Sequence, residues 1–168
     1  GVSATTFDAT NNDFSVYNGI NPFTEFEPGK GYWIKVTKTS QPKYNLLWDI
    51  DDNGAVDALS DGILITRFLN GFQGDDIIRG AVSTDAKRKT SDEITNYLNL
   101  LNEQGLLDVN DDGESKAYSD GLILVRYMFG FDGQSLIKDL ITENSKRKTA
   151  NEIINYINTA KLSIKGDV

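Results

Sequence analysis

The chain has 168 residues, of which 39% are hydrophobic and 25% charged, a composition that suits a soluble globular protein of one or two domains. It contains no Cys and no His, which excludes thiolate and imidazole metal sites, Cys nucleophiles and His-based catalytic triads. The formal charge of −8 argues against nucleic acids and anionic membranes as partners, because both bind cationic surfaces.

The first 45 residues are rich in Phe, Thr and Asn and differ from the rest of the chain. The segment "PGKGYWIKV" predicts a Gly-containing turn that enters a strand with Tyr32, Ile34 and Val36 on one face. We therefore predict a small β-strand module over residues 1–45 and a second domain over residues 46–168. The segment "TKTSQPK", residues 37–43, is the expected boundary.

The rest of the chain is an internal repeat. An offset of 59 residues aligns "DIDDNGAVDALSDGILITRFLNGFQGDDII" with "DVNDDGESKAYSDGLILVRYMFGFDGQSLI", and "KRKTSDEITNYLN" with "KRKTANEIINYIN", without a gap. One structural unit is thus used twice. Two copies are too few for a solenoid, so we predict a pair related by a pseudo-two-fold axis.

Each copy predicts a helix directly after its acidic stretch, at residues 61–70 and 120–129, and Gly71 and Gly130 stand where a C-cap glycine is favoured. The apolar faces of these helices comprise Leu64, Ile65, Phe68 and Leu69 in the first copy, and Ile123, Leu124, Tyr127 and Met128 in the second.

A short helix is predicted at residues 75–82 and 134–141, and a longer one ends each copy. The longer helices begin with capping-box spacing, Thr90 with Glu93 and Thr149 with Glu152. The first of them leads directly into the second acidic stretch. No such helix precedes the first acidic stretch. We therefore predict that the C-terminal helix, residues 150–161, folds back and lies beside the first stretch as the other long helix lies beside the second.

Two acidic windows, residues 49–61 and 108–120, hold ten of the 25 acidic residues. In both, oxygen-bearing side chains recur at alternate positions with glycine at the sixth, which is typical of a loop that surrounds Ca²⁺ with six to eight oxygens. We predict two calcium sites. The candidate ligands are Asp49, Asp51, Asn53, the carbonyl of Ala55, Asp57 and Asp61 in the first loop, and Asp108, Asn110, Asp112, the carbonyl of Glu114 and Asp120 in the second.

The closing acid of each loop, Asp61 or Asp120, lies at position 13, where a standard loop has Glu at position 12. We interpret both loops as one residue longer, with this Asp as the last ligand. Capping of the next helix is the alternative, and the two roles are compatible. Because Lys116 stands where the first loop has Asp57, we predict weaker binding at the second site.

The stretches "DIDDNGAVDALSDGILITRFLNG" and "DVNDDGESKAYSDGLILVRYMFG" resemble type I dockerin repeats, which are duplicated calcium loop-helix units related to EF-hands. "EPGKGYW" resembles a small β module of bacterial surface and secreted proteins. The resemblance implies a mainly α domain of paired EF-hand/dockerin-like units. It also implies a secreted or cell-surface bacterial module, monomeric on its own, that folds on calcium and docks a cohesin-like or other extracellular protein domain. The alternative is a calcium-stabilised spacer or terminal cap of a larger surface protein, without a dedicated partner.

Other features have plainer interpretations. The run "KRKT" at 87–90 and 146–149 is interpreted as an exposed basic turn, with a partner-binding patch as the alternative. Trp33 and Trp48 are interpreted as packing residues, with a sugar platform as the alternative. The clustered acids are needed for metal, so no enzyme is expected. A calcium sensor with a Met-rich groove is disfavoured because the chain has one Met.

Overall fold

The computed structural model describes residues 3–8, 13–18, 32–35 and 45–163. The chain divides into two compact units, Gly1–Lys43 and Tyr44–Val168. In the first unit three strands form an antiparallel sheet in the order β2-β1-β3, with bounds β1 (Ser3–Asp8), β2 (Asp13–Asn18) and β3 (Tyr32–Lys35). Only the last strand was predicted from the sequence. Val36, the side chain of Trp33 and the expected boundary at 37–43 lie outside the described residues.

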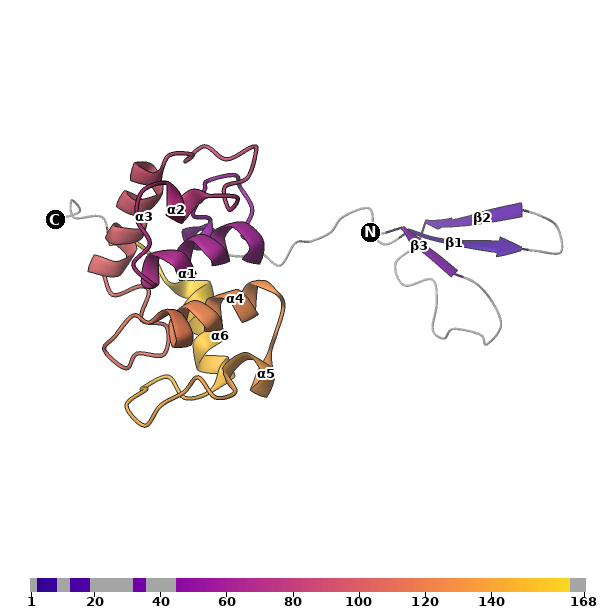
Figure 1. Cartoon of the computed structure of the whole chain (residues 1–168). Coiled ribbons are helices and arrows are strands. Elements are labelled where there is room, and N and C mark those ends of the chain that lie inside the picture. Colours follow the sequence, from indigo (N-terminus) through magenta and orange to yellow (C-terminus); the bar gives the residue numbers. More distant parts are fainter. Residues whose placement is uncertain (1–2, 9–12, 19–31, 36–44, 164–168) are drawn as a thin grey trace. The chain divides into compact units, whose positions relative to one another are not determined.

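The second unit is mainly helical (Figure 1). A 3₁₀ turn, η1 (Leu46–Trp48), leads into the first loop. The first copy then contains η2 (Ala58–Gly62), α1 (Ile63–Leu69), α2 (Asp75–Ile78) and α3 (Ser91–Glu103), and the second contains η3 (Ala117–Gly121), α4 (Leu122–Met128), α5 (Gly133–Ile137) and α6 (Ala150–Thr159). The order of elements is the same in both copies, as the repeat predicts.

The predicted ends of the helices are largely confirmed. Gly71 and Gly130 follow α1 and α4 with φ of +79° and +81°, the left-handed conformation that glycine adopts without strain. Both capping boxes at the starts of α3 and α6 are present.

The short helices are shorter than the predicted ranges of 75–82 and 134–141. Helix α2 ends at Ile78 and α5 at Ile137, because the chain soon takes a left-handed conformation that stops a helix. That conformation is found at Gly80 (φ +66°) and at its repeat equivalent Asp139 (φ +64°).

An arginine of the preceding helix holds each short helix in place. Arg67 Nη1 donates to the carbonyl oxygens of Ile77 at 3.0 Å and Arg79 at 2.8 Å. Arg126 does the same in the second copy, at 3.3 Å to Leu136 and 2.9 Å to Lys138. These arginines therefore satisfy carbonyl groups that the helix ends leave without intrahelical partners.

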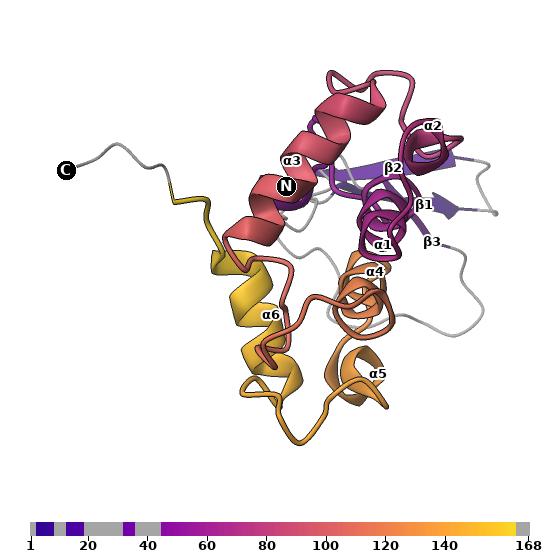
Figure 2. The ribbon, with the colours of Figure 1, turned by 60° about the vertical axis from the view of Figure 1, so that its left-hand side comes forward.

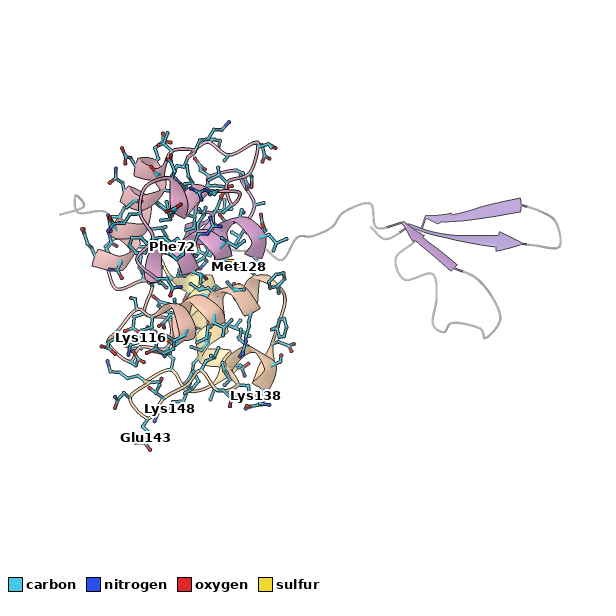
Figure 3. The ribbon with its side chains drawn as sticks, in the orientation of Figure 1. Phe72, Lys116, Met128, Lys138, Glu143 and Lys148 are labelled. Atoms are coloured by element: carbon cyan, nitrogen blue, oxygen red, sulfur yellow. The ribbon has the colours of Figure 1, made fainter. Side chains whose placement is uncertain are left out.

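Helices α1 and α4 pack antiparallel, with a glycine at each contact. A Cβ atom on Gly62 would lie 3.0 Å from Val125 Cγ2 and 3.4 Å from Met128 Sδ, near the end of α4. A Cβ on Gly121 would lie 3.4 Å from Leu69 Cδ1, at the end of α1. Each helix therefore begins against the end of the other, consistent with the predicted pseudo-two-fold pair. Figure 3 labels Met128 at this contact.

The long helices α3 and α6 run along one side of the unit, and α1 and α4 along the other (Figure 2). The core between them includes the fully buried Leu64, Ile65, Ile94, Leu98, Leu101, Ile123, Leu124, Ile153 and Ile157. Phe68, Leu69, Tyr97, Tyr127 and Tyr156 pack against this core while only partly buried. The apolar faces predicted from helical spacing are thus the faces that pack inward.

The C-terminal helix folds back onto the entrance of the first loop, as predicted. The side-chain amide of Asn45 donates to the carbonyl oxygens of Ile157 and Ala160, at the end of α6. The indole Nε1 of the fully buried Trp48 donates to Ile157 O at 2.8 Å. The two ends of the repeat pair are therefore joined, and Trp48 is a core residue.

Candidate metal centre

Three carboxylates of the first acidic window come together in the fold. Asp49, Asp51 and Asp61 each place one carboxylate oxygen within 4.8 Å of the others, and all three residues are buried. Asp51 and Asp61 are fully enclosed. A group of this kind can hold a metal ion, since buried carboxylate oxygens are ligands for hard divalent cations.

A π-helical turn brings Asp61 into the group. The N–H of Gly62 donates to Asp57 O five residues back, at 3.2 Å, which fits one extra residue into the turn. The Asp61 carboxylate then reaches the start of the loop, where Oδ1 accepts from Ile50 N at 2.6 Å and from Asp51 N at 3.3 Å. The loop is one residue longer than a standard calcium loop, and this turn accommodates the extra residue.

Backbone amides at the tip of the loop hold the other two carboxylates. Asp49 accepts from Asn53 N at 3.1 Å and Gly54 N at 2.8 Å. Asp51 accepts from Asn53 N at 3.2 Å and, across the fold, from Ser83 N at 2.9 Å. The tight turn depends on Gly54, whose φ of +92° is strained for any residue with a Cβ.

The negative charge of this group has no basic partner among the described residues. The ion pairs of the loop lie elsewhere, as in Lys87 with the exposed Asp52 at 3.4 Å. Burial raises the pKa of Asp61 to about 7 and also raises that of Asp49. Burial therefore disfavours the charged form of these two carboxyl groups.

The second loop repeats most of this geometry. Asp120 Oδ1 accepts from Val109 N at 2.8 Å and Asn110 N at 3.1 Å, and Oδ2 accepts from Lys116 N at 2.9 Å. Asp108 accepts from Gly113 N at 2.9 Å, and burial raises the pKa of Asp120. The difference is Asn110, whose amide replaces the carboxylate of Asp51, so the buried group of three acids occurs in the first loop alone among the described residues.

Asp57 does not join the carboxylate group of the first loop. It caps η2, accepting from Leu59 N at 3.0 Å, Ser60 N at 2.9 Å and Ser60 Oγ at 2.7 Å. Its oxygens are thus engaged by the start of the helix. Asp57, predicted as a ligand, is thus the helix cap, whereas Asp61, for which capping was the alternative, lies with Asp49 and Asp51.

The remaining candidates lie at the outer part of each loop. Asn53 accepts from Ala55 N at 2.8 Å and donates from Nδ2 to Ser83 Oγ at 2.9 Å. Asp112 makes the equivalent contact with Glu114 N at 3.1 Å, and the Glu114 side chain pairs with Lys116. Ala55 and Glu114 are exposed. Lys116, at the place of Asp57, therefore pairs with its neighbouring acid.

Two arginines of the "KRKT" runs contact the loops, which the sequence did not reveal. Arg88 donates from Nε to Ile50 O at 2.7 Å and stacks over the Tyr97 ring at 4.1 Å. Arg147 donates to Asp108 O and Val109 O, both at 3.0 Å, and stacks over Tyr156 at 3.7 Å. The prediction of exposed basic turns was wrong for these half-buried arginines, although the flanking lysines are exposed.

The spacing between each arginine and a tyrosine in the sequence could have indicated these contacts. In both copies the arginine precedes a helical Tyr by the same interval, so the two side chains meet when the helix forms. Burial raises the pKa of Tyr97, so its hydroxyl stays protonated and donates to Leu47 O at 2.9 Å. In each copy, the arginine and the tyrosine therefore link the basic turn and the long helix to the entry of the loop.

Comparison with protein-family models, with curated proteins and with solved structures gives no match for this chain. Among the described residues, no helix combines the length and the apolar character that crossing a membrane requires.

Proposed function

We propose that the second unit is a calcium-binding module in which each acidic loop holds one Ca²⁺ and metal binding is coupled to folding. The observation that carries this proposal is the buried group of Asp49, Asp51 and Asp61. Three buried carboxylates without a basic partner repel one another, and a divalent cation among them would offset that repulsion. Ca²⁺ fits better than Mg²⁺, because a flexible loop of oxygen ligands suits its variable coordination.

Isothermal titration of the chelator-treated protein with Ca²⁺ tests the proposal. We expect two binding events, and a gain in helicity or in thermal stability on loading. Asp61→Asn should abolish the first event, whereas Asp57→Asn, which removes a charge outside the carboxylate group and keeps the helix cap, should retain it. Absence of binding, or equal loss in both variants, would count against the site.

We also propose that the module serves protein attachment outside the cell, as a dockerin-like unit that docks a cohesin-like domain. Support comes from a groove of about 470 Å³ between α1 and α4, lined by equivalent residues of both copies. Leu59 is 67% exposed there, and its equivalent Tyr118 70%. Exposed large apolar side chains that gather along one groove are typical of interaction surfaces.

A pull-down from secreted bacterial proteins, with Ca²⁺ and with chelator, tests this second part. Docking predicts a stoichiometric calcium-dependent partner that Leu59→Asp with Tyr118→Asp no longer retains. The double variant should still bind Ca²⁺, because neither side chain belongs to the metal group. Absence of a partner would favour a calcium-stabilised spacer or terminal cap of a larger surface protein.

A further inference from the structure

A second hollow, of about 360 Å³, lies in the first copy between the turn that follows α1 and one face of α3. It is separate from the metal group and from the groove between α1 and α4. Its walls differ in character: Phe68 and Phe72 form an aromatic side, and α3 provides a polar side. Phe72, labelled in Figure 3, is 48% exposed, so its ring is accessible from solvent.

The polar side is a stripe of four residues on α3, Asp92, Thr95, Asn96 and Asn99. Their spacing of three and four residues places them on one helical face. Within the described part of the chain these four side chains make no hydrogen bond or ion pair, so their donors and acceptors face the hollow and solvent. Together they offer amide donors, amide acceptors, a hydroxyl and a carboxylate.

In the second copy a hydrogen bond spans the equivalent place. Tyr127 stands where the first copy has Phe68, and its hydroxyl donates to Asn158 Oδ1 at 2.6 Å. Asn158 is the equivalent of Asn99. Phe68 has no hydroxyl, so the first copy cannot form this bridge and leaves Asn99 available.

We propose that this hollow binds a neutral carbohydrate, such as one or two sugar residues of a glycan. The C–H face of a sugar ring packs against exposed aromatic rings, and its hydroxyl groups both donate and accept hydrogen bonds, as the Asn side chains do. No Lys or Arg lines the hollow, and Asp92 disfavours anions, so phosphate or carboxylate ligands do not fit. The proposal stands independently of calcium binding and of docking.

NMR titration of the whole calcium-loaded chain with cellobiose, maltose, lactose and chitobiose tests the proposal. We expect saturable shifts of the Asn96 and Asn99 side-chain amide signals with at least one sugar. Asn99→Ala and Phe72→Ala should each weaken binding by about tenfold or more, since both lose direct contacts. If none of the four sugars gives saturable shifts, the proposal is wrong.

The second copy supplies matched controls. Asn158→Ala and Phe131→Ala change the equivalent positions and should bind sugar as the unaltered chain does. Equal loss in these variants, or equal shifts in both copies, would also overturn the proposal. All four variants should keep their Ca²⁺ binding, which separates a failure of the sugar site from a failure of the metal site.

Discussion

The indole nitrogen of Trp48 donates a hydrogen bond of 2.8 Å to the carbonyl oxygen of Ile157, 109 residues further along the chain. Trp48 lies directly before the first acidic loop, and Ile157 lies in the last turns of α6. Both side chains are fully buried. This bond ties the C-terminal helix to the entrance of the first loop, so the stability of the whole repeat pair should depend on it.

Replacing Trp48 with Phe should destabilise the second unit by about 2 kcal/mol or more, because the Ile157 carbonyl loses the shorter of its two side-chain donors and a cavity forms. Urea unfolding in saturating Ca²⁺ measures the change. Leu46→Ala is the control, since Leu46 is 59% exposed in the same turn and should cost about 0.5 kcal/mol or less. Similar losses in both variants would show that the bond contributes little.

Arg88→Lys should also be costly, although it keeps the positive charge. The lysine lacks the planar fork with which Arg88 reaches two loop carbonyls, and it cannot stack flat over Tyr97. We therefore expect a loss of about 1–3 kcal/mol in urea unfolding. Arg147→Lys should behave alike in the second copy. Lys87→Ala removes only an exposed ion pair and should change stability by about 0.5 kcal/mol or less. A larger loss in Lys87→Ala than in Arg88→Lys would contradict this account.

The two interhelical glycines give a matched pair. Alanine gains about 1 kcal/mol over glycine within a helix, so Gly121→Ala, whose Cβ meets Leu69 at 3.4 Å, should be neutral or stabilising. Gly62→Ala places its Cβ 3.0 Å from Val125, so α4 has to shift and the gain is offset. Thermal unfolding should therefore rank Gly121→Ala above Gly62→Ala. The reverse order would show that α1 and α4 are not packed as described.

Local features of this fold could be predicted from the sequence because they depend on local spacing. The helical periodicity around Leu64, the capping box at Thr90 and the C-cap at Gly71 need only near neighbours. The repeat also predicted that α6 folds back. A helix leads into the second loop, so the first loop needs an equivalent helix beside it.

Other contacts between segments that are distant in the sequence were not predicted. Nothing near Arg88 in the sequence shows that its guanidinium returns to Ile50, because that contact depends on how the basic turn crosses the loop. Spacing placed both Asp57 and Asp61 among the ligands, and it did not reveal that Asp57 caps η2 while Asp61 alone joins Asp49 and Asp51. The π turn decides between them by adding one residue to the helix start.

The two proposed metal sites should bind Ca²⁺ with unequal affinity, the first more tightly. Affinity in such loops follows the charge and the placement of the ligands. Asn110 replaces the buried carboxylate of Asp51, whereas the extra acid of the second loop, Asp112, is only half-buried at the outer part of the loop. Asp51→Asn should weaken the first site by about tenfold, and Asn110→Asp should strengthen the second by a similar factor. Calorimetric titration of both variants checks the prediction. Two equal sites in the unaltered protein would refute it.

The metal-free protein should become more stable as the pH falls from 7.5 to 5. Burial raises the pKa of Asp61 in the folded chain to about 7, from 3.8 in the unfolded chain. Between these values the folded state holds a proton that the unfolded state has released, so acidification favours folding and the stability declines as the pH rises toward 7. With Ca²⁺ present the direction should reverse, because protons compete with the ion for the same carboxylates. Urea unfolding at several pH values, with chelator and with Ca²⁺, measures both trends, and Asp61→Asn should flatten the first. A chelated protein that gains stability between pH 5 and 7.5 would contradict the burial of Asp61.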